Sequence, residues 1–135
     1  MIRNTAVTVC GPLNVNKLGV TYVHEHLMVK PQLPDEYYIP YTLDDEAAST
    51  EETRSFSAAG GETLVEMTPI NYGRNVKAYQ RIAQATGVHV ICCTGFHKQL
   101  FMPPWFGDKT DGELYDILMD EVTNGLDDTE IHPGV

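Results

Sequence analysis

One run, VHVICCTGF at residues 88–96, constrains the fold of this chain more than any other feature. Successive side chains of a β-strand point to opposite faces, and this run is apolar on both of them. A strand that is apolar on both faces needs a cover on each side, which is typical of parallel sheets with flanking helices. We therefore expect residues 88–96 to lie in the middle of a parallel α/β sheet.

The remainder of the sequence alternates between strand-like and helix-like segments. A short strand at 5–10 is followed by turn-forming Gly, Pro and Asn residues, which predicts a small hairpin or a lid. Residues 30–42 hold three prolines and three tyrosines and are predicted to be a loop, and the final HPGV resembles the start of another strand. Further strands are predicted near residues 20–26, 63–68 and 89–95, and helices at 43–59, 73–86 and 111–122.

Capping residues set the ends of the predicted helices. Asp44 or Asp45 is the expected N-cap of the first helix, and Asp111 is that of the third. Gly87 and Gly125 are expected to end the second and third helices, because glycine adopts the left-handed conformation that closes a helix.

Alternating strands and helices imply parallel pairing through right-handed crossovers. On this pattern an open three-layer sheet and a (β/α)8 barrel are both compatible with the sequence. The length of 135 residues suggests one domain. It favours the open sheet, because a barrel takes about 250 residues.

Composition excludes two classes of partner. The 19 acidic residues against 9 basic ones give a net charge of −10, which argues against nucleic acid as a partner. No apolar stretch approaches the ~18 residues of a membrane span. The three cysteines, without a secretory leader, predict free thiols in a cytoplasmic protein.

The triplet His24-Glu25-His26 is the sharpest local motif. Residues two apart on a strand share a face, so His24 and His26 present two imidazoles side by side. They fall at the carboxyl end of the first long strand, where parallel α/β folds place their ligands. Imidazole is a common metal ligand, so the pair predicts a metal site, although a chance pair on an exposed strand end gives the same pattern. Glu25 faces the other way and is expected to be a structural carboxylate.

Four motifs in order carry a resemblance to a known family. GVTYVHEHL at 19–27 resembles the opening strand of the phosphotriesterase family, within the amidohydrolase superfamily. NYGRN at 71–75 resembles the turn into the second helix of that family, and CTGFH at 93–97 resembles the end of its third strand. EVTNGLDDTEIHPGV at 121–135 resembles the run that leads to its fourth strand. The chain is similar to the N-terminal part of the family, and in particular of its lactonase-like members.

The resemblance implies a (β/α)8 TIM barrel. Residues 1–135 would form a partial barrel domain of about three βα units after a short hairpin, truncated before the fourth barrel strand. The barrel mouth would hold two divalent metals, expected to be Zn with Mn or Co as alternatives, which activate a hydroxide. His24 and His26 would ligate one metal. The other ligands, including a bridging lysine or glutamate, are not within these residues, so no catalytic residue is assigned in the chain.

Three residues near the predicted mouth are candidates for binding substrate. Tyr72 follows the second strand, and His97 and Lys98 follow the third. The lysine cation suits an anionic substrate such as a phosphorylated lactone. The alternative for all three is an ordinary loop residue. Asn71 and Arg74 are expected to serve the turn and the helix cap.

Three functions remain open on the sequence. The first is hydrolysis of a lactone or related small-molecule ester by the complete barrel. The second is amide hydrolysis or deamination, since the amidohydrolase superfamily shares the His-x-His motif, although NYGRN and CTGFH favour the first. The third is a non-catalytic fragment or subunit. Three barrel strands expose sheet edges and apolar helix faces, so more chain or a partner, such as a homo-oligomer, is expected to cover them.

Overall fold

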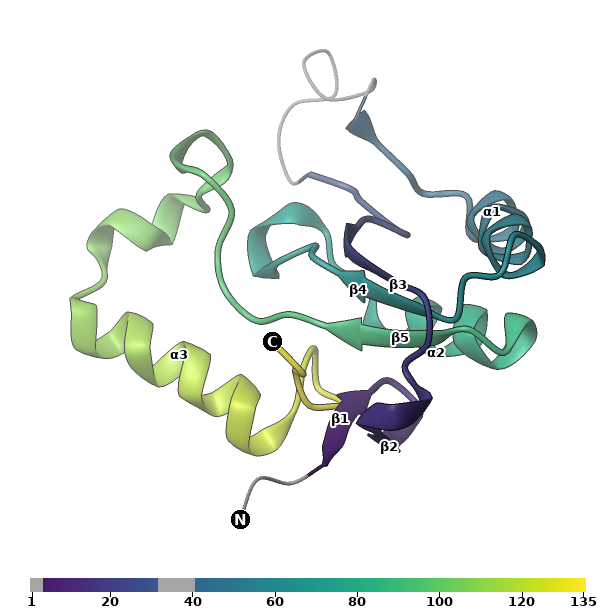
Figure 1. The fold of residues 1–135 in the computed structure, drawn as a ribbon. Coiled ribbons are helices and arrows are strands. Elements are labelled where there is room, and N and C mark those ends of the chain that lie inside the picture. Colours follow the sequence, from purple (N-terminus) through teal and green to yellow (C-terminus); the bar gives the residue numbers. More distant parts are fainter. Residues whose placement is uncertain (1–3, 32–40) are drawn as a thin grey trace.

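The computed structural model describes residues 4–31 and 41–135, and most of the predicted loop at 30–42 lies outside these described residues. Its main sheet is parallel, in the order β3 (Thr21–Glu25), β4 (Thr63–Glu66) and β5 (His89–Cys92). Each strand is followed by a helix, as Figure 1 shows. These are α1 (Glu46–Ala58), α2 (Val76–Thr86) and α3 (Asp111–Asn124). The predicted α/β class and parallel pairing are confirmed.

The position predicted for residues 88–96 is wrong in one respect. β4, whose four residues are all buried, is the central strand, and β5 stands at one end of the three-stranded order. β5 is nevertheless buried at three of its four positions. Segments that are not strands supply its missing neighbours: the Val9 amide donates to the Val90 carbonyl at 2.9 Å, and the Gly134 amide donates to the Cys92 carbonyl at 2.8 Å.

An extra residue interrupts the alternation of β3. Tyr22 is paired with Leu64, but the next paired residues are Glu25 and Glu66, so three steps on β3 match two on β4. This is the count of a β-bulge, which changes the face to which the following side chains point. The bulge lies between Tyr22 and Glu25, so it includes His24, and the strand ends one residue before His26.

The N-terminal segment forms the predicted hairpin. β1 (Thr5–Thr8) pairs with β2 (Gly11–Asn14) in antiparallel register. Gly11 and Pro12, which the sequence assigned to the turn, instead lie in β2, and the turn is at Val9 and Cys10. Proline is tolerated there because β2 is an edge strand and its missing N–H is not needed.

Local chemistry fixes the helix ends, with three corrections. α2 begins at Val76, three residues later than predicted, and its cap is Asn75 rather than Arg74, because the Asn75 side chain accepts from the Ala78 amide. The Asp45 side chain accepts from the backbone amides of Ala47 and Ala48, so α1 begins three residues later than predicted, and Leu43 pairs with Val29. The N-cap of α3 is Thr110 rather than Asp111, because its hydroxyl bonds the Glu113 amide in a capping box. Gly87 and Gly125 follow the ends of α2 and α3, as predicted.

The core lies between the sheet and α2. Tyr79 and Ile82 of this helix are almost completely buried, in one hydrophobic cluster with Val90 and Cys92 of β5 and with Leu126. Gly73, just before the helix, has φ 76°, and a Cβ there would lie 2.2 Å from the Lys30 carbonyl oxygen. Glycine therefore permits both the left-handed turn and the close approach of the chain after β3.

Helix α3 is held differently, because none of its residues is buried and it lies to one side of the sheet in Figure 1. Polar contacts attach it: Thr94 Oγ1 donates to Glu121 at 2.6 Å, and the Arg74 guanidinium, whose side chain is 1% exposed, contributes more bonds. Arg74 bonds both carboxylate oxygens of Glu121 on α3, the Asp127 carboxylate at 2.7 Å and the Cys93 carbonyl at 3.2 Å. Within residues 4–31 and 41–135, no helix has the length and apolar character to cross a bilayer.

Candidate metal centre

The carboxyl end of β3 brings two imidazoles together. The ring centroids of His24 and His26 lie 5.3 Å apart with planes at 70°. His24 is exposed and His26 is half-buried, so both rings border an open space. Two imidazoles that converge from one strand end can supply two nitrogen ligands to one ion.

Two buried polar side chains, Thr68 and Glu66, lie behind His26. His26 Nδ1 is 2.9 Å from Thr68 Oγ1 and 3.8 Å from the Glu66 carboxylate. Glu66 and Thr68 are both 0% exposed, and they come from the carboxyl end of the central strand β4. The Glu66 carboxylate accepts from the Thr68 amide at 2.8 Å and also from the Leu27 amide. With Nδ1 occupied in this way, Nε2 is the nitrogen of His26 left for a ligand.

The environment changes the pKa values of these groups. Burial lowers the pKa of His26, and the neighbouring His24 and His97 lower it further. Burial is also the main cause of a lowered pKa at His97. A neutral imidazole has a free lone pair for a metal, so both shifts favour the ligating form. Burial raises the pKa of Glu66 to about 7, against the opposing effect of its hydrogen bonds.

The loops after β4 and β5 bring aromatic rings to the same place. The Tyr72 ring lies 6.0 Å from that of His26 and 4.5 Å from that of His97. Phe101 packs against both Tyr72 and His97, at 4.9 Å from each ring. The structure therefore unites Tyr72 and His97 with the histidine pair in one cluster.

Lys98 and Asn71 lie next to this cluster of rings. Lys98 is exposed, and its Nζ lies 5.4 Å from the centre of the Phe101 ring, as in a cation–π contact. Asn71 is buried, where the sequence suggested a simple turn. Its amide donates to the Phe101 carbonyl at 2.7 Å, and its oxygen accepts from the His97 amide at 2.7 Å. Asn71 thus fixes the loop that carries His97.

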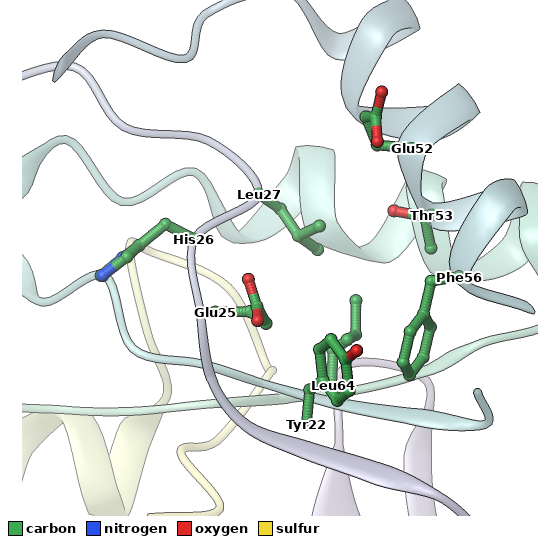
Figure 2. A pocket seen from close by; sticks show the side chains of 8 residues that line it. All are labelled: Tyr22, Glu25, His26, Leu27, Glu52, Thr53, Phe56 and Leu64. Carbon is green, nitrogen blue, oxygen red and sulfur yellow. The ribbon is translucent and has the colours of Figure 1, made fainter. Parts of the chain in front are cut away.

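Glu25 lies on the other side of β3, as the sequence predicted. With Tyr22 it lines a cavity of about 310 Å³ against Glu52 and Phe56 of α1. His26 also contributes to the lining of this cavity, but Figure 2 shows its ring extending away from Glu25, across the strand. The bulge in β3 explains why Tyr22 and Glu25 share one face although they are three residues apart.

The other histidines do not join the cluster. His89 begins β5, at the far end of the strand, and His132 Nδ1 lies 3.1 Å from the Val122 carbonyl. Within the described part of the chain, no three His, Cys, Asp or Glu side chains are grouped as a metal site requires. The pair His24 and His26 therefore fits a metal as part of a larger ligand set.

Sequence reasoning did not find Glu66, Thr68 or the role of Asn71. The signal for Glu66 was a single acidic residue inside the otherwise apolar run TLVEM, because a buried carboxylate needs partners. Thr68 and Asn71 gave no comparable signal, since threonine and asparagine are common where a strand passes into a loop.

Comparison with known proteins identifies the family. A model of the phosphotriesterase family matches residues 4–135. The chain belongs to the phosphotriesterase family. The family that the four motifs suggested is thereby confirmed.

Individual relatives support this placement in the phosphotriesterase family. The phospho-furanose lactonase of Mycoplasmopsis synoviae is 34% identical over 134 residues, covering 95% of this chain and 38% of that protein. The N-acetyltaurine hydrolase of Danio rerio is 30% identical and covers 99% of this chain and 47% of its own length. The solved structure of an amidohydrolase from Mycoplasma synoviae matches with a TM-score of 0.88 and 30% identity, covering 99% of this chain and 42% of that one.

This member of the phosphotriesterase family spans less than half the length of the relatives that it matches. The matched part contains β3 with its histidine pair and the two loops that carry Tyr72 and His97.

Proposed function

We propose that the protein is a metal-dependent hydrolase that cleaves a lactone or related ester when its barrel is complete. The observation that carries this proposal is the convergence of His24 and His26, 5.3 Å apart, with Tyr72 and His97 from the neighbouring strand ends. Parallel α/β folds bind their ligands at this end of the sheet. The lactonase relative supports a lactone as the substrate class.

In this proposal His24 and His26 are ligands of a pair of divalent ions, expected to be Zn, with Mn or Co as alternatives. Two such ions activate water and polarise the oxygen of the bond that is attacked. Burial lowers the pKa of His26 and so favours the neutral form that a ligand requires, and the contact at its Nδ1 leaves Nε2 for the ion. Two protein nitrogens fill about half of the coordination of zinc, so the remaining ligands come from residues outside this chain.

Tyr72, His97 and Lys98 are proposed to border the substrate. The rings of Tyr72 and His97, tilted by 31° with centroids 4.5 Å apart, form one wall beside the histidine pair. Lys98 places an exposed cation next to this wall, where it can bind the phosphate of a phosphorylated lactone as a point charge. Asn71 holds the backbone of His97 and so maintains the wall.

We further propose that β3, β4 and β5 are the first strands of a (β/α)8 barrel in a cytoplasmic protein. Exposed Val20 and Val23 along β3 and the unburied helix α3 are surfaces that further barrel units, or a second copy in a homo-oligomer, would cover. The 135 residues alone are expected to be inactive, because most of the ligands are missing.

Zinc titration followed by NMR tests the metal proposal. His24→Ala and His26→Ala should each abolish the shifts that zinc causes at the end of β3, because one imidazole alone binds zinc weakly. His132→Ala is the matched control, since this ring lies by α3, and it should leave the titration unchanged. Equal zinc binding in all three variants would refute the assignment of His24 and His26.

A turnover assay tests whether the 135 residues alone are inactive, as proposed. The isolated chain, supplied with zinc or manganese, should hydrolyse neither a lactone nor a phosphotriester. Metal-dependent turnover by the 135 residues would show that the active site is elsewhere in this chain.

Amide hydrolysis is the second candidate, and one observation favours it. The N-acetyltaurine hydrolase relative acts, by its name, on an N-acyl bond to a sulfonate-bearing amine. Lys98 suits such an anion as well as a phosphate. Including an N-acyl aminosulfonate in the assay of the complete protein separates the two: preferred cleavage of the amide would replace the lactonase proposal.

A further inference from the structure

The hydrogen bond at His26 Nδ1 has a direction that its surroundings determine. Thr68 Oγ1, 2.9 Å away, carries one hydrogen and two lone pairs. The Glu66 carboxylate lies beside this contact, because its Oε1 is 3.8 Å from His26 Nδ1 and accepts the Thr68 amide at 2.8 Å. A carboxylate oxygen this close favours a hydrogen on Nδ1 rather than a lone pair. His26 Nδ1 therefore carries the hydrogen, and Thr68 Oγ1 faces it with a lone pair.

Glu66 holds this arrangement in place from both sides. One carboxylate oxygen accepts the Thr68 amide at 2.8 Å, and the other accepts the amide of Leu27, the residue after His26. The backbone on each side of the Thr68–His26 contact is thus tied to one carboxylate. Glu66 and Thr68 are fully buried, and every buried polar side-chain atom in the described residues has a partner.

We propose that Thr68, held by Glu66, is a positioning residue that fixes His26 in the Nδ1–H tautomer and so presents Nε2 beside His24. The role in metal binding rests on the proposed function, whereas the tautomer does not. When one ring nitrogen of a histidine is held as a donor, the other is left with the lone pair that a metal takes. Partners of this kind typically contribute a factor of about 10 to 100 to metal affinity.

The tautomer is measured directly in the metal-free protein. Long-range ¹H–¹⁵N NMR correlations on the ¹⁵N-labelled chain at pH 8 distinguish Nδ1–H from Nε2–H, with the His26 signals assigned by their loss in His26→Asn. Wild-type protein should show Nδ1–H. Thr68→Val, which keeps the shape but removes the hydroxyl, should lose this preference, and Thr68→Ser should retain it.

A matched control separates positioning from general loss of stability. Thr53→Val also removes a buried hydroxyl, but that group donates to the Ser49 carbonyl within α1. It should leave the His26 tautomer unchanged. In zinc titrations followed on the His24 and His26 signals, Thr68→Val should weaken binding at least ~10-fold and Thr53→Val should not.

The outcomes are distinct. Nε2–H at His26 in wild-type protein overturns the inference, as does a Thr68→Val protein that matches Thr53→Val in both tautomer and zinc affinity. If Thr68→Val does not fold, the wild-type and Thr68→Ser tautomers still decide. An Nδ1–H tautomer that depends on Thr68 in a protein without zinc affinity upholds the positioning role and refutes the metal proposal.

Discussion

Removing the Arg74 guanidinium should destabilise this protein far more than removing a similar arginine at the surface. The Arg74 side chain is 1% exposed and its partner Glu121 is 12% exposed. Arg74→Ala leaves that carboxylate without its counter-charge in a nearly dry site, and breaking a buried pair costs about 3–5 kcal/mol. Asp127 is 36% exposed, so water can solvate its carboxylate once the arginine is gone. We therefore expect the loss of unfolding free energy to lie at the lower end of this range, about 3 kcal/mol.

Arg81 is the matched control. It also forms a two-pronged pair with a glutamate, Glu46, at 2.8 and 2.7 Å, but the two side chains are 55% and 37% exposed. An exposed pair of this kind contributes little, because water solvates both ions and screens their attraction. With a urea m-value of about 2 kcal/mol/M, the unfolding midpoint should fall by about 1.5 M in Arg74→Ala and should change far less in Arg81→Ala.

Circular dichroism in urea gives both midpoints, and amide hydrogen exchange shows where the loss occurs. Because α3 has no buried residue, its amides should lose protection first in Arg74→Ala. The reasoning is refuted if the two variants have equal midpoints and equal protection in α3.

Three further predictions concern other parts of the chain. Burial raises the pKa of all three thiols, but Cys10 is exposed whereas Cys92 and Cys93 are buried. At pH 8 a thiol reagent should therefore modify only Cys10 in the folded protein and all three thiols after denaturation, and rapid labelling of three would contradict this. Gly87 has φ 75° and open space around it, so Gly87→Ala should lower the free energy of unfolding in urea by about 1–2 kcal/mol. Gly73→Ala should lower it clearly more, because the new Cβ would also clash with the Lys30 backbone, and equal losses would refute that clash. Hydrogen bonds with Thr110 lower the pKa of Glu113 to about 2 from 4.5, so its contribution to α3 is complete above pH 4.5 and is lost as the pH falls toward 2. Glu113→Gln should remove that part of the acid transition seen by circular dichroism, and an unchanged acid transition would refute it.

The sequence was sufficient for features that repeat locally. Alternation of strands and helices predicted the parallel sheet, and glycine punctuation predicted the ends of α2 and α3. The placement of the histidine pair at a strand end also followed from the two-residue period of a strand. Each of these depends on residues that are near one another in the chain.

Features that join distant segments were not predictable in this way. Thr68 meets His26 across 42 residues, and Arg74 meets Glu121 across 47. Polar residues in loops carry no periodic signal, so only the folded chain shows which of them become buried together. The central place of β4 was missed for a similar reason: the apolar character of β5 reports burial, and segments other than strands supply that burial.

The extra residue in β3 is an insertion that the strand accommodates without moving its two ends relative to β4. Between Tyr22 and Glu25 three steps on β3 match two on β4, so both side chains stay on the face toward α1. Deletion of Val23 would leave two steps against two, and plain alternation would keep Glu25 on that face and His24 and His26 on the other. Library designs for this segment should therefore include this one-codon deletion, which is expected to be better tolerated than a one-residue deletion in the regular strand β4, where every later side chain would change face.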